Sequence, residues 1–224
     1  MTGTLARYFG MRFLTTLVAV LLGIFSLVIL LDYVETMVYF PEVGARLSRW
    51  TATGFTLGLG SLDADAVVHA VVADAAAEAS RATGLAVQVG PRGDVDLSIA
   101  PDDPGFAQFP TARALTYLQL IDNNIVGGRT VFQSREDITG ESPAPLYNVV
   151  LHEVGHALGL GSSPRPNDIM GDDNRTTQSR QFSQRELVVL KVMYAYRRPG
   201  NTSPDRDPGV ASTQHRRTIV LIAR

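Results

Sequence analysis

The longest apolar stretch of the chain covers residues 13–31 and contains neither a charged residue nor a proline. A run of about 18 or more such residues is long enough to cross the hydrocarbon core of a membrane as a helix. Arg7 and Arg12 precede the run, and Asp32 and Glu35 follow it. Because positive charges favour the cytoplasmic side, the pattern predicts a cytoplasmic N-terminus (residues 1–12) and an exported remainder.

A cleaved signal peptide is the alternative interpretation of this segment. The apolar core of a signal peptide typically has about 7–15 residues and precedes a cleavage site built from small residues. Residues 13–31 exceed that length, and no small-x-small site follows them directly. The sequence therefore favours a single-pass membrane anchor. A connector (residues 32–49) would join it to a domain on the extracytoplasmic side.

Shorter apolar periods beyond the connector indicate a globular domain over residues 50–198. Apolar residues spaced by three and four predict helices, with Gly84 and Gly159 as stop signals. Alternating apolar and polar residues predict strands. The predicted helices cover residues 61–83, 142–160 and 183–196, and the predicted strands cover residues 50–59, 85–89, 95–99, 114–120 and 130–133. Residues 199–224 are predicted to form a loose tail, with 218–223 as a candidate short strand.

Composition removes several classes of function. The formal net charge is −2, and no basic stripe with interleaved aromatic residues is present, so the sequence predicts no nucleic-acid partner. The chain has no cysteine, which excludes disulfides, cysteine-based zinc sites and thiol catalysis. With four histidines in the whole chain, a histidine-based site has few candidate members.

The candidate chemistry lies in residues 149–161, which have the sequence VVLHEVGHALGLG. His152 and His156 are four residues apart and therefore share one face of a helix, where both rings can bind one zinc ion. Glu153 is placed to reach a water in the open coordination position, as a general base. A core helix with two satisfied histidines is the alternative, but it gives no reason for the glutamate.

This segment, followed by Asp168, Ile169 and Met170, resembles the matrixins within the metzincin clan. Residues 114–117 (ALTY) and 127–132 (GGRTVF) also resemble the strands that precede the catalytic helix in that family. The resemblance, over about residues 50–196, implies an α+β zinc metalloendopeptidase with a twisted, mostly parallel sheet packed on long helices. It implies that His152 and His156 are ligands, Glu153 is the general base and Met170 is an apolar floor. Residues 114–117 would be the edge strand that pairs with a peptide or protein substrate.

One position departs from the matrixin pattern. The third histidine ligand is expected at position 162, where this chain has Ser162, and a hydroxyl is a poor zinc ligand beside imidazole or carboxylate. Asp168 is the predicted substitute, from the loop before the methionine. The alternatives are Asp172 or Asp173, His215 from the tail, Glu186 on the next helix, or a weak site in an inactive relative.

Two further features leave alternatives open. Residues 5–8 (LARY), residues 12–14 (RFL), the apolar run, and then Asp32 and Glu35 follow one another in the first forty residues. This segment resembles the first transmembrane helix of lipopolysaccharide-export permeases, which suggests a borrowed anchor or an accessory subunit of a lipid-export complex. Four acidic residues offer oxygen ligands for a structural Ca²⁺, although loops and turns commonly use aspartate in the same way. These residues are Asp94, Asp96, Asp102 and Asp103. The competing functions are a membrane-anchored zinc endopeptidase, an inactive peptide-binding module of the same fold, and the lipid-export subunit.

Overall fold

The computed structural model describes residues 2–38, 49–121, 124–139, 146–171, 180–194 and 216–223. The chain divides into two units, Met1–Val38 and Tyr39–Arg224. The first contains the predicted anchor, and the second contains the predicted globular domain.

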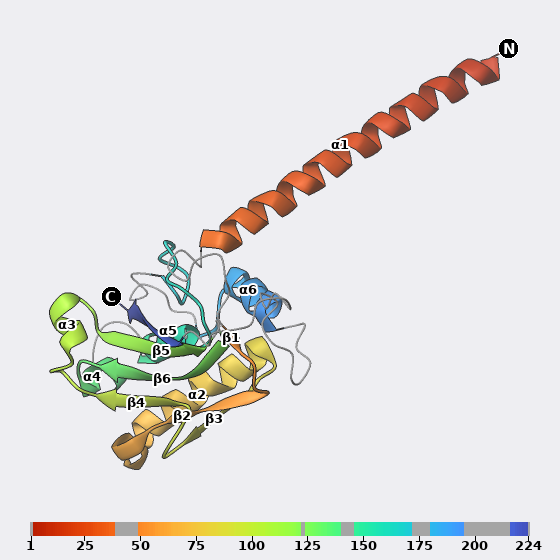
Figure 1. The fold of residues 1–224 in the computed structure, drawn as a ribbon. Coiled ribbons are helices and arrows are strands. Elements are labelled where there is room, and N and C mark those ends of the chain that lie inside the picture. Colours follow the sequence, from red (N-terminus) through yellow and green to blue (C-terminus); the bar gives the residue numbers. More distant parts are fainter. Residues whose placement is uncertain are drawn as a thin grey trace. The chain divides into compact units, whose positions relative to one another are not determined.

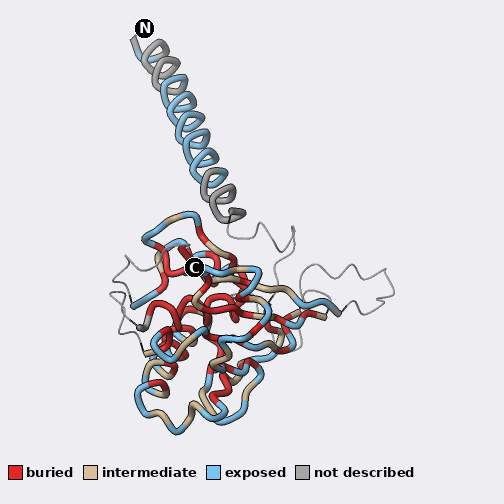
Figure 2. Tube along the Cα trace, turned by 90° about the vertical axis from the view of Figure 1, so that its left-hand side faces the viewer, coloured by how far each residue is buried: buried red, intermediate tan, exposed pale blue. Residues whose placement is uncertain are grey.

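The first unit is one long helix, α1 (Thr2–Val38). Within it, the 19 residues Arg12–Leu30 are long and apolar enough to cross a membrane, by length and composition. Every side chain described in that stretch is exposed (Figure 2). The helical prediction for residues 13–31 is confirmed, and the helix extends beyond the apolar run on both sides.

The second unit is built on one seven-stranded sheet (Figure 1). Its strands are β1 (Arg49–Trp50), β2 (Gly54–Gly58), β3 (Ala86–Gly90), β4 (Val95–Ile99), β5 (Ala114–Ile121), β6 (Asn124–Phe132) and β7 (Arg216–Ala223). The order is β3-β2-β4-β6-β5-β7, with β1 paired to β6. Four pairings are parallel, and β5 is antiparallel to both of its neighbours. The prediction of a mostly parallel sheet in an α+β domain is confirmed.

One helix of this unit has clear local causes at both of its ends. The helices are η1 (Gly60–Ala64), α2 (Ala66–Thr83), α3 (Pro104–Gln108), α4 (Arg135–Thr139), α5 (Leu146–Ala157) and α6 (Gln184–Tyr194). Asp65 caps α2 by accepting hydrogen bonds from the amides of Val67 and Val68. The sequence placed this start at residues 61–63, which instead form the 3-10 turn η1. Gly84 ends α2 with φ 74°, as predicted.

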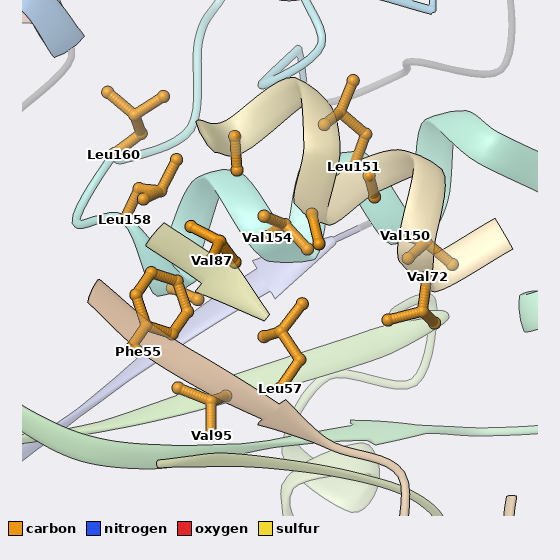
Figure 3. Close-up of a cluster of buried hydrophobic side chains, with 14 of the residues drawn as sticks. Phe55, Leu57, Val72, Val87, Val95, Val150, Leu151, Val154, Leu158 and Leu160 are labelled. Atoms are coloured by element: carbon orange, nitrogen blue, oxygen red, sulfur yellow. The ribbon is translucent and has the colours of Figure 1, made fainter. Parts of the chain in front are cut away.

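Helices α2 and α5 pack against each other over the sheet and enclose the main hydrophobic core (Figure 3). Leu57 and Val95 from the strands meet Val72 of α2 and Val154 of α5 there. This arrangement buries α5 almost completely, which is the condition for a water-excluding site on that helix.

The C-terminal end of α5 is fixed by two aromatic side chains from distant parts of the chain. The indole Nε1 of Trp50 donates to the carbonyl of Ala157 at 2.8 Å, and the Tyr194 hydroxyl donates to the carbonyl of Leu158 at 2.8 Å. The last carbonyls of a helix have no partner within the helix, so these bonds satisfy groups that would otherwise be buried unpaired. The same bonds hold α5 in position relative to β1 and α6.

Three further stretches differ from the sequence predictions. The predicted loop at 101–110 contains α3, whose cap is Asp103, and β6 begins at Asn124 and thus covers more than residues 130–133. Residues 216–223 form the full-length strand β7 rather than a loose tail. The reason is that apolar side chains on both faces of β7 find partners in the core clusters. Residues 199–215 lie outside the described part of the chain.

Candidate metal centre on helix α5

The two predicted histidine ligands face each other on α5. His152 Nε2 and His156 Nε2 are 3.0 Å apart, and the rings are nearly perpendicular, at 86°. Both side chains are buried, with exposed fractions of 1% and 0%. The spacing of four residues therefore brings two nitrogens to one point, as the sequence predicted.

Backbone carbonyls set the tautomer of both rings. His152 Nδ1 lies 2.7 Å from the carbonyl oxygen of Ile169, and His156 Nδ1 lies 2.9 Å from that of Leu160. A carbonyl oxygen only accepts, so each Nδ1 carries the proton and each Nε2 is left with a lone pair. Burial lowers the pKa of His152 to about 4, although the backbone of Ile169 and of Ile222, as hydrogen-bond acceptors, acts to raise it. The imidazole is therefore neutral at physiological pH, as a metal ligand must be.

This arrangement fits a zinc ion for two of its ligands. Two lone pairs at 3.0 Å repel each other unless a cation lies between them. Nitrogens that share one tetrahedral zinc at 2.0–2.1 Å are roughly 3.3 Å apart, close to the observed separation. Hydrogen bonds from Nδ1 to carbonyls are the usual outer support of zinc-binding histidines.

Glu153 lies beside the pair and is held by the sheet. Its Oε2 accepts a hydrogen bond of 2.6 Å from the Thr116 hydroxyl on β5, which is also 2.7 Å from the Thr130 hydroxyl on β6. The other oxygen, Oε1, is buried and has no hydrogen-bond partner among the described residues. One carboxylate oxygen is thus anchored, and the other is left for a ligand or a water.

Burial raises the pKa of Glu153 to about 8, against the opposing effect of the Thr116 hydrogen bond. A cation held by the neighbouring histidines would oppose this rise, because an opposite charge favours the ionised carboxylate. The site therefore combines a carboxylate that readily takes a proton with a position for a cation.

Asp168, the predicted third ligand, is not brought to the histidine pair. Its Oδ2 accepts a hydrogen bond of 2.8 Å from the Ser163 hydroxyl, and the side chain is buried. Across the described ranges, no three His, Cys, Asp or Glu side chains group around a common metal position. Ser162 is half-buried. Asp172, Asp173 and His215 lie outside the described residues.

Glu186, the other candidate ligand, has a structural role in this fold. It is fully buried, and its two oxygens accept from the amides of Met170, at 2.7 Å, and Ser183, at 2.5 Å. The Ser183 hydroxyl in turn accepts from the Glu186 amide at 3.3 Å, which completes a capping box at the start of α6. The sequence predicted that this helix begins at residue 183. Glu186 thus joins α6 to the turn that carries Met170.

We expect Glu186→Ala to lower the free energy of unfolding by about 3 kcal/mol or more, because the buried amide of Met170 and the partly buried amide of Ser183 lose hydrogen bonds to a charged acceptor. The loss should be equal with excess zinc and with a chelator, measured by urea denaturation. Glu186→Gln, which keeps one acceptor oxygen, is the matched control and should lose less. A variant that keeps its stability but loses zinc would contradict the structural role.

Met170 is buried directly against α5. A Cβ atom added to Gly155 would overlap the Met170 sulfur, so the glycine between the two histidines makes room for the methionine. This contact agrees with the resemblance, which implies that Met170 is an apolar side chain beneath the metal position. The close approach requires glycine at position 155, a requirement that the sequence pattern did not reveal.

The carboxylates considered for Ca²⁺ bind their own chain. Asp94 accepts from the Thr56 amide at 2.8 Å, and Asp96 accepts from the Gly93 amide at 3.3 Å. Asp103 accepts from the Gly105 amide and the Tyr117 hydroxyl, and it pairs with Arg129 at 3.0 Å. Three of the four therefore act as turn and cap residues.

The strand predicted to be the substrate-binding edge is not an edge in this structure. β5 lies between β6 and β7 and pairs with β7 from Ala114↔Ala223 to Ile121↔Arg216. The prediction of a free edge at residues 114–117 is therefore wrong for the chain in this state. The missed signal is the uninterrupted apolar run of Ile219, Val220, Leu221 and Ile222, which suits a strand buried on both faces.

Comparison with known proteins agrees with this geometry. A search of curated protein sequences gives no match. The sequence profile of the matrixin family matches residues 62–195, which is more than half of the chain and includes the histidine pair, Glu153 and Met170. The chain belongs to the matrixin family.

Proposed function

We propose that this protein is a membrane-anchored zinc endopeptidase that hydrolyses peptide bonds with Glu153 as general base. The observation that carries the proposal is the convergence of two buried Nε2 atoms at 3.0 Å, beside a carboxylate with one oxygen that has no partner among the described residues. Membership of a metalloprotease family supports the same reaction class.

The residues of the chain divide the work between them. His152 and His156 would hold the zinc, oriented by the carbonyls of Ile169 and Leu160. Bound zinc lowers the pKa of water and polarises a carbonyl. Glu153 would take the proton from the attacking water at its free Oε1 and later return it to the leaving amine. Thr116 keeps that carboxylate aimed by binding Oε2.

An inactive peptide-binding module is the second candidate, and a specific observation favours it. Position 162 is a serine, and the described residues supply two imidazoles without a third ligand. A site with two protein ligands would hold zinc weakly, unless Asp168 moves or a residue outside the described ranges completes it. This candidate keeps the fold and the peptide-binding strand without the chemistry.

Metal content and cleavage, measured together on the full-length chain in detergent, separate these functions. We expect about one zinc per chain, with cleavage of a quenched fluorescent denatured protein that a chelator removes and added zinc restores. His156→Ala should lose both the zinc and the cleavage. A folded chain that binds zinc but cleaves nothing, even when β7 is detached from β5, would refute the protease and support the peptide-binding module.

The anchor part of the proposal gives a topology prediction. In vesicles of defined orientation, protease added on the extracytoplasmic side should digest the domain and spare the first dozen residues. The reason is that Arg7 and Arg12 precede the apolar run and acidic residues follow it. Protection of the domain would reverse the orientation. A mature N-terminus beyond residue 31 would instead indicate a cleaved signal.

A further inference from the structure

The C-terminal strand occupies the place that the proposed function reserves for a substrate. β7 pairs antiparallel with all of β5, over eight residues on each strand. It lies at one end of the strand order, seen as the dark blue arrow beside β5 in Figure 1. β7 also contacts α5, the helix that carries the histidines. β7 therefore contacts both elements that form the candidate site, the strand β5 and the helix α5.

The register directs an aliphatic side chain to the general base. Leu221 is the partner of Thr116, the residue whose hydroxyl holds Glu153. Directly opposite residues of an antiparallel pair share a face, with their Cβ atoms about 4.5–5.5 Å apart. Leu221 is only 5% exposed and belongs to the main core cluster, as does Val149 of α5. β7 therefore inserts Leu221 beside the residues that position Glu153.

The main chain of β7 reaches the histidine pair. The backbone of Ile222, the residue after Leu221, acts to raise the pKa of His152, so β7 lies beside this ring. An extended peptide that adds to a sheet edge uses main-chain hydrogen bonds for affinity and alternate side chains for specificity. β7 has both features, and it also brings a peptide group to the ring that would bind the metal.

We propose that residues 216–223 are an intramolecular pseudosubstrate that keeps the peptide-binding edge closed until the strand is released. This proposal rests on the proposed function, because it describes the regulation of the same site. It also predicts a substrate class, namely extended peptides with an aliphatic residue opposite Thr116. Release is structurally simple, since β7 has one strand neighbour and its Arg217 and Thr218 side chains are exposed.

A reversible disulfide tests the proposal in the full-length chain, which has no cysteine of its own. Gln119 and Thr218 are partners across β5 and β7, and both are exposed. Opposite residues in such a pair have Cα atoms about 4.5–5.5 Å apart, within the range that a disulfide spans. In Gln119→Cys/Thr218→Cys, the oxidised protein should cleave the quenched denatured protein about tenfold more slowly, or worse, than the same protein after reduction. The tethered strand competes with substrate for β5 at an effective concentration of roughly millimolar. The disulfide prevents the strand from leaving β5 at all.

Single-cysteine variants are the controls and should not respond to reduction. Cleavage by the oxidised lock at the rate of its reduced form would overturn the proposal, and it would leave the proposed protease function intact.

A release variant with a matched control gives the opposite test. Leu221→Asp places an unpaired charge at a buried position and should expel β7, whereas Thr218→Asp adds the same charge at an exposed position of the same strand. Leu221→Asp should cleave faster than wild type and Thr218→Asp should not. Circular dichroism verifies folding of both, and if Leu221→Asp fails to fold, the disulfide lock decides.

A binding measurement separates failure of this proposal from failure of the proposed function. A fluorescent peptide with the sequence of residues 216–223 should bind Leu221→Asp and should not bind the oxidised lock. Peptide binding without cleavage, with zinc present, would retain the pseudosubstrate and refute the protease. A folded Leu221→Asp that neither binds the peptide nor gains activity would overturn the pseudosubstrate.

Discussion

Replacing Glu153 with glutamine is expected to lower kcat/KM by roughly 10²–10⁴-fold, the usual effect of losing a general base. Glutamine has nearly the same shape and retains an oxygen that can accept the Thr116 hydrogen bond. It lacks the ability to take a proton from water. Zinc content and thermal stability should therefore stay at wild-type values while cleavage is lost.

The control for this substitution is Thr116→Val, which removes the hydroxyl that aims Glu153 but leaves the carboxylate. We expect a smaller loss of activity, because the base is present but less well oriented. Both variants should be assayed with β7 released, in the Leu221→Asp background, so that strand release does not limit the rate. Full activity of Glu153→Gln in that background would show that Glu153 is not the base.

Local geometry explains why the core of the site was predictable from sequence. The relation between His152, Glu153 and His156 depends on helical periodicity alone, and the flanking apolar residues identify the helix. The strands at 86–90 and 95–99 could also be predicted from sequence, because their apolar and polar residues alternate regularly. These features need no information about distant parts of the chain.

Long-range packing could not be inferred in the same way. The sequence left Glu186 as a candidate ligand, and only the fold shows that it joins the start of α6 to the Met170 turn. Thr116 is an ordinary strand residue until the packing of α5 brings Glu153 to it, 37 positions away. A partial signal existed, since Thr116 is the polar member of a face otherwise formed by Ala114, Leu118 and Leu120.

The pairing of β7 shows the same limit. The sequence suggested a short strand at residues 218–223, but nothing local indicates which strand it joins. The choice of β5 depends on a free sheet edge and on an apolar position beside Thr116, both of which exist only in the folded domain. The sequence therefore predicted a substrate-binding strand and a tail separately, and it did not predict that they pair with each other.

Changing Ser162 to histidine should tighten zinc binding by roughly 10–100-fold. Structural zinc sites with four ligands have binding free energies of about 10–16 kcal/mol, or about 3 kcal/mol per ligand. Part of that gain is offset by displacing the water or oxygen that now completes the site. The turn at Gly159, which has φ 91°, directs the chain back towards α5 at this position in the matrixin pattern.

Zinc titration with a competing chelator measures the effect, which should be largest at low free zinc because a saturated site has little to gain. Ser163→His is the matched control. Ser163 is buried, and its hydroxyl donates to Asp168, so a histidine there should disturb the turn without improving affinity.

The aspartate expected from the sequence is tested in the same series. If Asp168 moves to the metal when zinc binds, Asp168→Ala should release zinc from the natural chain but be tolerated beside Ser162→His. That outcome is non-additivity, as expected for residues that share one site. Equal losses in both backgrounds would instead assign Asp168 to the turn, through its bond to Ser163. Unchanged zinc affinity in Ser162→His would mean that position 162 does not face the histidine pair, and the third ligand would then have to come from outside the matrixin pattern.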